Sequence, residues 1–269
     1  MYQFTIGQTQ IMGILNVTPD SFSDGGRFFS VQAAVDRAVQ IEQEGADILD
    51  IGAQSTRPGS VAIPPAEELR RLLPVLDALR DKLRIPISID TFYPAVALAA
   101  LERGAVIVNN VSGWVSRDFI WATLGYGAGL VLVRNACRAG GGIPLPEMVE
   151  LALEFGLKKQ QLCIDPGLGF TASREEDFRL LAQTQSLKME GIAYLVGASR
   201  KRFTGEGVLP GGRLAGSIAA QTVAQLGGAD ILRVHDVKEA VQAVNLTKEV
   251  QRIFLEADNL RIDTKAKTL

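Results

Sequence analysis

Polar and charged side chains stand at or shortly after the end of each of eight short apolar segments of the sequence. A single polar residue in such a position usually forms a turn or caps a helix. Eight positions together favour one site that holds carboxylates, amides and a few cations. This set suits a ligand with a hydrogen-bonding heterocycle and an anionic tail. In chain order the main residues are Asn16, Thr56, Arg57, Asp90, Asn109, Arg134, Asp165, Lys201, Arg233 and His235.

The apolar segments that precede these residues have the length and composition of buried parallel strands. Amphipathic segments lie between them, for example the segment with Val31, Ala34, Val35, Ala38 and Ile41 at helical spacing. This alternation predicts an α/β fold, a (β/α)8 TIM barrel whose strand ends meet at one mouth, with a doubly wound open sheet as the alternative. The predicted strands are Ile11–Leu15, Ile48–Ile51, Ile85–Ile89, Ala105–Val108, Gly129–Val133, Leu162–Ile164, Tyr194–Val196 and Ile231–Val234.

The chain shows no change in composition that would divide it into two domains. We therefore expect residues 1–269 to form a single domain, which is compatible with the usual size of a TIM barrel. The last segment, residues 261–269, is polar, and we expect it to fray.

The overall composition narrows the classes of function. A net charge of -2 argues against a nucleic-acid surface, so any phosphate affinity must come from a few local cations. The two cysteines, Cys137 and Cys163, form neither a disulfide framework nor a zinc motif, and no long apolar segment predicts a membrane span. We expect a cytoplasmic protein that acts on small molecules, without nucleic-acid or membrane partners.

Several runs of residues resemble, in the same order, the signatures of one enzyme family, the dihydropteroate synthases. The resemblance covers essentially the whole chain, and its first run is long and specific. It implies a pterin-binding TIM barrel that joins 4-aminobenzoate to 6-hydroxymethyl-7,8-dihydropterin diphosphate and releases pyrophosphate. The runs are Ile11–Gly26, Gly45–Gly52, Ser55–Gly59, Ser88–Thr91, Asn109 with Val111–Gly113, Asp165–Phe170, Gly197–Lys201 and Arg233–Val237.

By this resemblance, the pterin ring is held by a set of carboxylate, amide and amine groups that can read its donor and acceptor edge. The diphosphate is surrounded by a second set, in which Asn16 contacts Mg²⁺, the implied cofactor. The predicted pterin residues are Asp90, Asn109, Asp165 and Lys201, and the predicted diphosphate residues are Asn16, Thr56, Arg57, Arg233 and His235. For Asp90 and Asp165, the alternative is that they only cap the following turns.

The resemblance also assigns the chemistry of bond exchange. Departure of the diphosphate leaves a methylene cation on the pterin, and the first loop closes over it with Asp24. The implied catalytic residues are Asp24, Lys201, Arg57, Arg233 and His235, and the implied aminobenzoate residues are Phe22, Thr56, Pro58 and Arg202. The family is commonly dimeric, so a homodimer is expected.

Four places depart from the family pattern. Arg202 stands where a serine is usual, Asn110 where an aspartate is usual, Gln54 where a glutamate is usual, and the segment 134–142 replaces a loop with histidine and methionine. Arg202 could bind the aminobenzoate carboxylate in bidentate fashion or block its slot. Arg202, Asn110 and the altered segment leave open a non-catalytic pterin-binding paralogue. A pterin-dependent methyltransferase of related fold is a further alternative.

Overall fold

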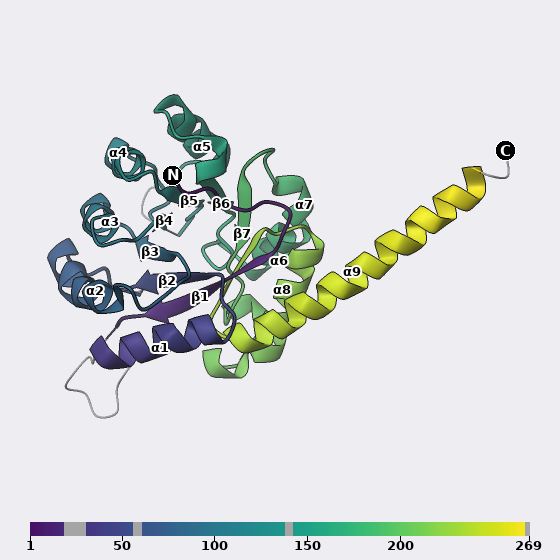
Figure 1. Cartoon of the computed structure of the whole chain (residues 1–269), viewed down its shortest axis with the longest axis horizontal. Coiled ribbons are helices and arrows are strands. Elements are labelled where there is room, and N and C mark those ends of the chain that lie inside the picture. The colour runs from purple at the N-terminus through teal and green to yellow at the C-terminus, as the bar shows by residue number, and fades with distance from the viewer. Residues whose placement is uncertain (19–30, 56–60, 138–141, 267–269) are drawn as a thin grey trace.

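The computed structural model describes residues 1–18, 31–55, 61–137 and 142–266, with the backbone alone for residues 255 and 257–266. Its centre is a closed barrel of parallel strands in chain order, surrounded by helices (Figure 1). The strands are β1 Gln10–Asn16, β2 Ile48–Gly52, β3 Ile87–Thr91, β4 Ile107–Asn110, β5 Gly129–Val133, β6 Leu162–Asp165, β7 Ala193–Val196 and β8 Ile231–Val234.

Closure is made by the first and last strands. Gln10–Gly13 of β1 pairs in parallel with Ile231–Val234 of β8. This pairing confirms the predicted TIM barrel and excludes the doubly wound open sheet. Strands β5 and β8 have the predicted bounds, whereas β3 and β4 begin two residues later than predicted, at Ile87 and Ile107. Pro86 directly precedes β3 and has no N–H to give to a neighbouring strand.

Helices cover the outside of the barrel, and most lie between consecutive strands. Proline opens α2 and α3, where its missing N–H is not needed, and Ser116 and Ser173 cap α4 and α6 through their side chains. The helices are α1 Val31–Gln43, α2 Pro65–Leu79, α3 Pro94–Leu101, α4 Arg117–Gly125, α5 Leu145–Glu154, α6 Arg174–Ala182, α7 Thr184–Leu187, α8 Leu214–Leu226 and α9 Val237–Ala266. Short 3₁₀ turns are η2 Lys159–Gln161, η3 Arg202–Thr204 and η4 Pro210–Gly212.

Two apolar clusters form the core, because neighbouring residues of a strand point to opposite faces. Leu49 and Ile51 of β2 pack with Ala34 and Ala38 of α1 in the cluster between sheet and helices. Ile48, which directly precedes Leu49 and points to the opposite face, belongs to a separate cluster inside the barrel, with residues from other strands such as Met12 and Val131. Inward positions nearer the carboxyl ends of the strands carry polar side chains instead, and they form the site described below.

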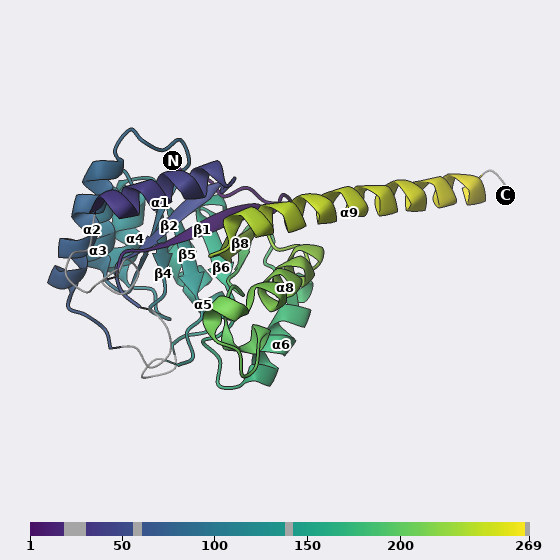
Figure 2. The same cartoon turned by 90° about the horizontal axis from the view of Figure 1, so that it is seen from below.

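The C-terminal helix α9 runs from Val237 to Ala266, with the backbone alone described for residues 257–266, and residues 267–269 lie outside the described part. The fraying expected for residues 261–269 remains a prediction. The helix begins against the barrel and projects far beyond it (Figures 1 and 2). None of the helices in the described ranges is long and apolar enough to cross a membrane.

Gly13 allows α1 to pack directly on β1. A Cβ atom at this position would lie 2.5 Å from Ile41 Cγ2 and 3.0 Å from Val237 Cγ2. Both neighbours are buried β-branched side chains, which have little rotamer freedom. The close approach of strand and helix therefore requires glycine.

We expect Gly13→Ala to lower the free energy of unfolding by about 1–3 kcal/mol, because the added methyl group overpacks this contact. Gly125→Ala is the control, since a Cβ atom at the end of α4 meets no other atom within 4 Å. The control should be neutral or stabilise by up to about 1 kcal/mol. Equal urea midpoints for the two variants would show that the contact is not tight.

Candidate active site

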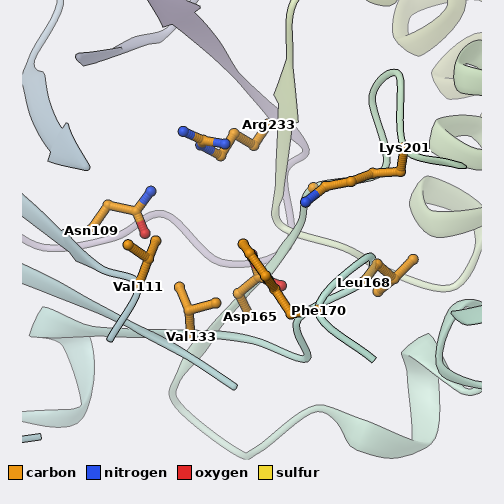
Figure 3. A pocket seen from close by; sticks show the side chains of 9 residues that line it. Asn109, Val111, Val133, Asp165, Leu168, Phe170, Lys201 and Arg233 are labelled. Carbon is orange, nitrogen blue, oxygen red and sulfur yellow. The ribbon is translucent and has the colours of Figure 1, made fainter. Parts of the chain in front are cut away.

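A pocket opens at the carboxyl ends of the strands, where active sites of TIM barrels lie. Its lining combines apolar side chains with a few polar and charged groups, as is typical of small-molecule sites. Lys201 reaches into it from one side, and Asn109 and Arg233 approach from the other (Figure 3). The lining residues are Asn109, Val111, Val133, Asp165, Leu168, Phe170, Gly197, Lys201 and Arg233.

Asp90 is placed by β3 with its side chain inside the barrel, where it is almost fully buried. Burial raises the pKa of this carboxyl to about 7; Arg233 opposes the shift, and the nearby Asp50 adds to it. Asp90 Oδ2 accepts a hydrogen bond from Arg233 Nη2 at 2.5 Å. Asp90 Oδ1 is buried and has no hydrogen-bond partner among the described residues. It can therefore accept an N–H group of a ligand.

Arg233 joins two carboxylates across the barrel. Its Nη2 contacts Asp90, and its Nε donates to Oδ2 of Asp50 at 2.6 Å. Burial alone would lower the pKa of the guanidinium, but the two carboxylates outweigh this effect and hold it above its usual value. Arg233 was predicted as a diphosphate residue; the structure places it in the same pocket as Asn109, Asp165 and Lys201. Its pairing with Asp50 was not predicted.

Asn109 on β4, like Asp90, has one paired and one unpaired side-chain polar atom among the described residues. Its Nδ2 donates to Asp50 Oδ2 at 3.2 Å, and its Oδ1 is buried without a partner among the described residues. Buried polar atoms without partners are uncommon in native proteins and often mark a binding site. Two acceptors, one on Asp90 and one on Asn109, are thus left for a ligand that carries hydrogen-bond donors.

Asp165 and Lys201 form the opposite side of the pocket. Asp165 Oδ1 accepts from the backbone N–H of Gly167 at 2.8 Å, so this carboxylate does form the turn that was considered as the alternative to ligand binding. Asp165 also lines the pocket, so turn formation and ligand contact are compatible. Burial raises the pKa of Asp165 to about 6, and burial lowers the pKa of Lys201 to about 8, with a further decrease caused by Arg233.

The side chain of Lys201 lies against the ring of Phe170 and against Gly169. Its Nζ lies 4.2 Å from the centre of the Phe170 ring, which attracts the cation. A Cβ atom at Gly169 would lie 2.5 Å from Cδ of Lys201. A Cβ atom at Gly167 would lie 1.9 Å from the carbonyl oxygen of Arg134. Gly167 thus allows the close approach of the Arg134 backbone, Gly169 that of the Lys201 side chain, and Phe170 is a pocket residue that we did not predict individually.

The predicted diphosphate residues are only partly described. Asn16 ends β1 and is half-buried, and His235 directly follows β8 with its Nδ1 3.1 Å from Ser199 Oγ. The neighbouring loops are joined by Arg200, which donates to both carboxylate oxygens of Asp236 at 3.0 and 2.5 Å. Thr56 and Arg57 lie outside the described residues, as do the first-loop and acceptor residues Phe22, Asp24 and Pro58.

Arg202 begins the 3₁₀ turn η3, and its side chain is exposed. It directly follows Lys201, which lines the pocket, but Arg202 is not itself among the described lining residues. Its predicted contact with aminobenzoate remains a prediction.

Two other departures from the family pattern, Asn110 and Gln54, have structural explanations, and the segment 134–142 is described in part. Asn110 is buried, donates to the carbonyl oxygen of Trp114 at 2.6 Å and accepts from the N–H of Ser112, so its amide shapes a loop. An aspartate could not donate the first of these bonds. Arg134 pairs with Glu176 at 2.8 Å, which commits its charge to the protein. Residues 138–141 of this segment lie outside the described residues.

Gln54 forms a buried pair with a carboxyl group on α2. Its Nε2 lies 2.6 Å from Glu68 Oε2, and its Oε1 accepts from the N–H of Ile63 at 3.4 Å. Burial raises the pKa of Glu68 to about 7, although hydrogen bonds from Thr91 and Gln54 oppose the shift. The pair connects the end of β2 to the segment that leads into α2, on either side of residues 56–60.

The donor set also bears on the implied Mg²⁺. Within the described ranges no group of three or more His, Cys, Asp and Glu side chains could hold a metal ion. The amide oxygen of Asn16 is a ligand of the kind that Mg²⁺ accepts, and Mg²⁺ often takes its other ligands from substrate phosphates and water. Asn16 therefore fits an ion that is held together with a diphosphate.

Comparisons with known proteins agree with this geometry. The family described as "Pterin binding enzyme" matches residues 12–140 and 142–235. The dihydropteroate synthase of Synechocystis sp. is 41% identical over 264 residues, covering 91% of both chains. The structure of Xanthomonas albilineans dihydropteroate synthase with 4-aminobenzoic acid has a TM-score of 0.84 and 40% identity, covering 91% of this chain and 93% of that one.

Another relative is longer. The chain is 40% identical over 253 residues to a probable bifunctional folylpolyglutamate synthase/dihydropteroate synthase of Haloferax volcanii, of which it spans 30%. The barrel and its pocket thus define a pterin-binding enzyme. Within that class, the chain belongs to the dihydropteroate synthase family.

The raised pKa of Glu68 predicts how stability depends on pH. Its folded pKa of about 7 exceeds the ordinary value of 4.5, so its contribution is complete below about 4.5 and is lost as the pH rises through 7. Glu68→Gln should therefore reduce the fall in unfolding free energy between pH 5 and pH 8, by up to roughly 3 kcal/mol. Urea unfolding at both pH values measures this.

Glu150→Gln on α5 removes an exposed carboxylate and serves as the control. It should keep the pH dependence of the parent. If Glu68→Gln shows the same fall as this control, Glu68 is not the buried acid that the structure indicates.

Proposed function

We propose that the protein is a dihydropteroate synthase, which condenses 6-hydroxymethyl-7,8-dihydropterin diphosphate with 4-aminobenzoate to give 7,8-dihydropteroate and pyrophosphate. The observation that carries this proposal is the pair of buried acceptors without partners among the described residues, Asp90 Oδ1 and Asn109 Oδ1. Asn109 lines the pocket together with Lys201, and the charge of Lys201 also acts on Asp90. A pterin presents ring N–H and amino groups next to acceptor atoms, and this pocket offers the complementary set. The membership in the family supports the same reaction.

The pterin is held from two sides in this proposal. Asp90, Asn109 and Asp165 accept hydrogen bonds from the ring, and Lys201 donates one to it. Protonated Lys201 is available below its pKa of about 8, and ionised Asp165 above its pKa of about 6. Phe170, Val111 and Val133 supply apolar contacts, since they line the same pocket. Fixing the ring in this way places its hydroxymethyl diphosphate arm toward the mouth of the barrel.

Asn16, Thr56, Arg57 and His235 would bind the diphosphate, with Arg233 near its junction with the ring. When bound, Mg²⁺ would neutralise charge on the departing diphosphate, and Asn16 would hold the ion. The C–O bond to the diphosphate breaks, and the amine nitrogen of 4-aminobenzoate then forms a C–N bond to the methylene carbon and loses a proton. Closure of the first loop with Asp24 would stabilise the cation and exclude water.

The acceptor is assigned to the loops after β1, β2 and β7. Phe22, Thr56 and Pro58 would flank its ring, and Arg202 would pair with its carboxylate in bidentate fashion, because a guanidinium matches carboxylate geometry. Asn110 has a structural role in its loop, so its departure from the family pattern no longer favours a non-catalytic paralogue. The proposed compartment is the cytoplasm, in agreement with two free cysteines, Cys137 and Cys163.

Turnover tests these assignments. Pyrophosphate release should require the pterin diphosphate, 4-aminobenzoate and Mg²⁺ together. Lys201→Ala should lower kcat/KM for the pterin diphosphate by about a hundredfold or more, since a charged hydrogen bond is lost in a buried site. Arg202→Ser should raise KM for 4-aminobenzoate and leave KM for the pterin substrate unchanged.

An unchanged KM for 4-aminobenzoate in Arg202→Ser would remove the carboxylate role of Arg202. Absence of pyrophosphate release by the folded parent protein with all three components would contradict the proposed function itself.

We also propose a homodimer in which α9 contributes to the interface. Its exposed apolar side chains Leu246, Val250, Ile253 and Phe254 follow a helical spacing of three and four residues, and we call them the α9 apolar stripe. Monomers rarely expose such a continuous apolar surface. We propose a second copy of this chain as the partner of the stripe. Helix α9 packs against α8, and α8 also exposes two apolar side chains, Val223 and Leu226.

Light scattering should give twice the monomer mass of 28.9 kDa for the parent protein. Ile253→Lys should shift the mass toward the monomer, because it places a charge in the apolar stripe. Gln251→Lys adds the same charge on α9 outside the stripe and should leave the dimer intact. A monomeric parent, or equal masses for the two variants, would contradict this interface.

A further inference from the structure

Asp50 is a buried carboxylate in the middle of β2. It was not among the site residues expected from the sequence. Its side chain is completely inaccessible. In the register of the barrel it lies between Ile14 of β1 and Ser88 of β3. A carboxylate inside a barrel is costly unless it is paired. Asp50 is paired with two groups that belong to the pterin pocket, Arg233 and Asn109.

The contact with Asn109 fixes the direction of an amide. Asp50 Oδ2 lies 3.2 Å from Nδ2 of Asn109. An ionised carboxylate only accepts hydrogen bonds, so the amide must turn its NH₂ group toward Asp50. The amide oxygen then points the other way, and Figure 3 shows it directed toward Val111, another residue of the pocket. With the opposite orientation, Asn109 would offer a donor where the pocket now offers an acceptor.

Because of the contact with Asp50, the guanidinium of Arg233 has two carboxylate partners. Asp50 Oδ2 holds Nε at 2.6 Å, and Asp90 Oδ2 holds the terminal Nη2 at 2.5 Å. Nε lies closer to the backbone, so its contact restrains the side chain more than the contact of the terminal nitrogen. A ligand that binds Asp90 can compete with Nη2 while Nε remains on Asp50.

We propose that Asp50 is a positioning residue for pterin binding, which orients the amide of Asn109 and anchors Arg233 so that Asp90 can exchange its contact with Arg233 for one with the pterin ring. This inference rests on the proposed function, since it concerns the same pocket. Asp50 does not line the pocket among the described residues, so it acts through its two partners.

Asp50→Asn tests this role, because it keeps the shape of the side chain and removes its charge. Calorimetry with 6-hydroxymethyl-7,8-dihydropterin, without diphosphate, should show affinity about ten- to hundredfold weaker than in the parent, as expected for lost hydrogen bonds to a charged group. KM for the pterin diphosphate should rise more than kcat falls. Ser88→Ala is the matched control, since Ser88 is an equally buried neighbour of Asp50 on β3 with no hydrogen-bond partner for its Oγ among the described residues.

The pH dependence separates positioning from general destabilisation. Asp90 is surrounded by Arg233, Asp50, Lys201 and Asp165, and Asp50 contributes to its raised pKa. Without the charge of Asp50, the pKa of Asp90 falls, so the acidic limb of pterin binding should move to lower pH. Ser88→Ala should leave both the pterin affinity and the pH of the acidic limb unchanged. A lower affinity with an unmoved limb, or parental binding by Asp50→Asn, would overturn the proposal.

If Asp50→Asn does not fold, Asn109→Asp asks the same question. Its new carboxylate would face Asp50, so its pterin affinity should be weaker at pH 8 than at pH 6 by more than in the parent. A pH-independent loss would contradict the contact. Failure of the parent protein itself to bind the pterin would instead contradict the proposed function, and the two failures are therefore distinguishable.

Discussion

The ion pairs of Arg233 inside the barrel are the constraint on which the site depends. Arg233 on β8 holds Asp50 on β2 and Asp90 on β3, so residues far apart in the sequence share one buried charge. Removing any of these charges from water is costly, and only mutual pairing compensates. The pairing is possible because β8 closes on β1 and brings the last strand next to the first strands. Closure of the barrel thus brings the charged residues of the pocket together.

The pocket keeps its polar groups incompletely paired. Burial shifts the pKa of Asp90 to about 7 and that of Asp165 to about 6, and it shifts the pKa of Lys201 in the opposite direction, to about 8. Each shift reflects a charged form that the protein alone does not fully stabilise. A ligand with ring N–H donors and acceptor atoms would supply the missing partners. Groups with pKa values shifted in this way are common in active sites.

Much of this organisation could be predicted from the sequence. The strand ends carried Asp90, Asn109, Asp165 and Lys201, because parallel strands present their carboxyl ends at one face. Asp50 was missed because it lies within the strand, among apolar residues, where only the inward position in the closed barrel explains a carboxylate. The effect of Asn110 and Gln54 could not be predicted either, since their partners, Trp114 and Glu68, depend on loop and helix packing.

The central claim is that buried Asp90 and Asp165 accept, and Lys201 donates, hydrogen bonds to a pterin ring. The most direct test is the affinity of the parent protein for 6-hydroxymethyl-7,8-dihydropterin, measured by calorimetry from pH 5 to pH 9.5. The affinity should rise as Asp165 and Asp90 ionise, up to about pH 7, and fall as Lys201 loses its proton above about pH 8. An affinity that stays constant over this range would contradict the account.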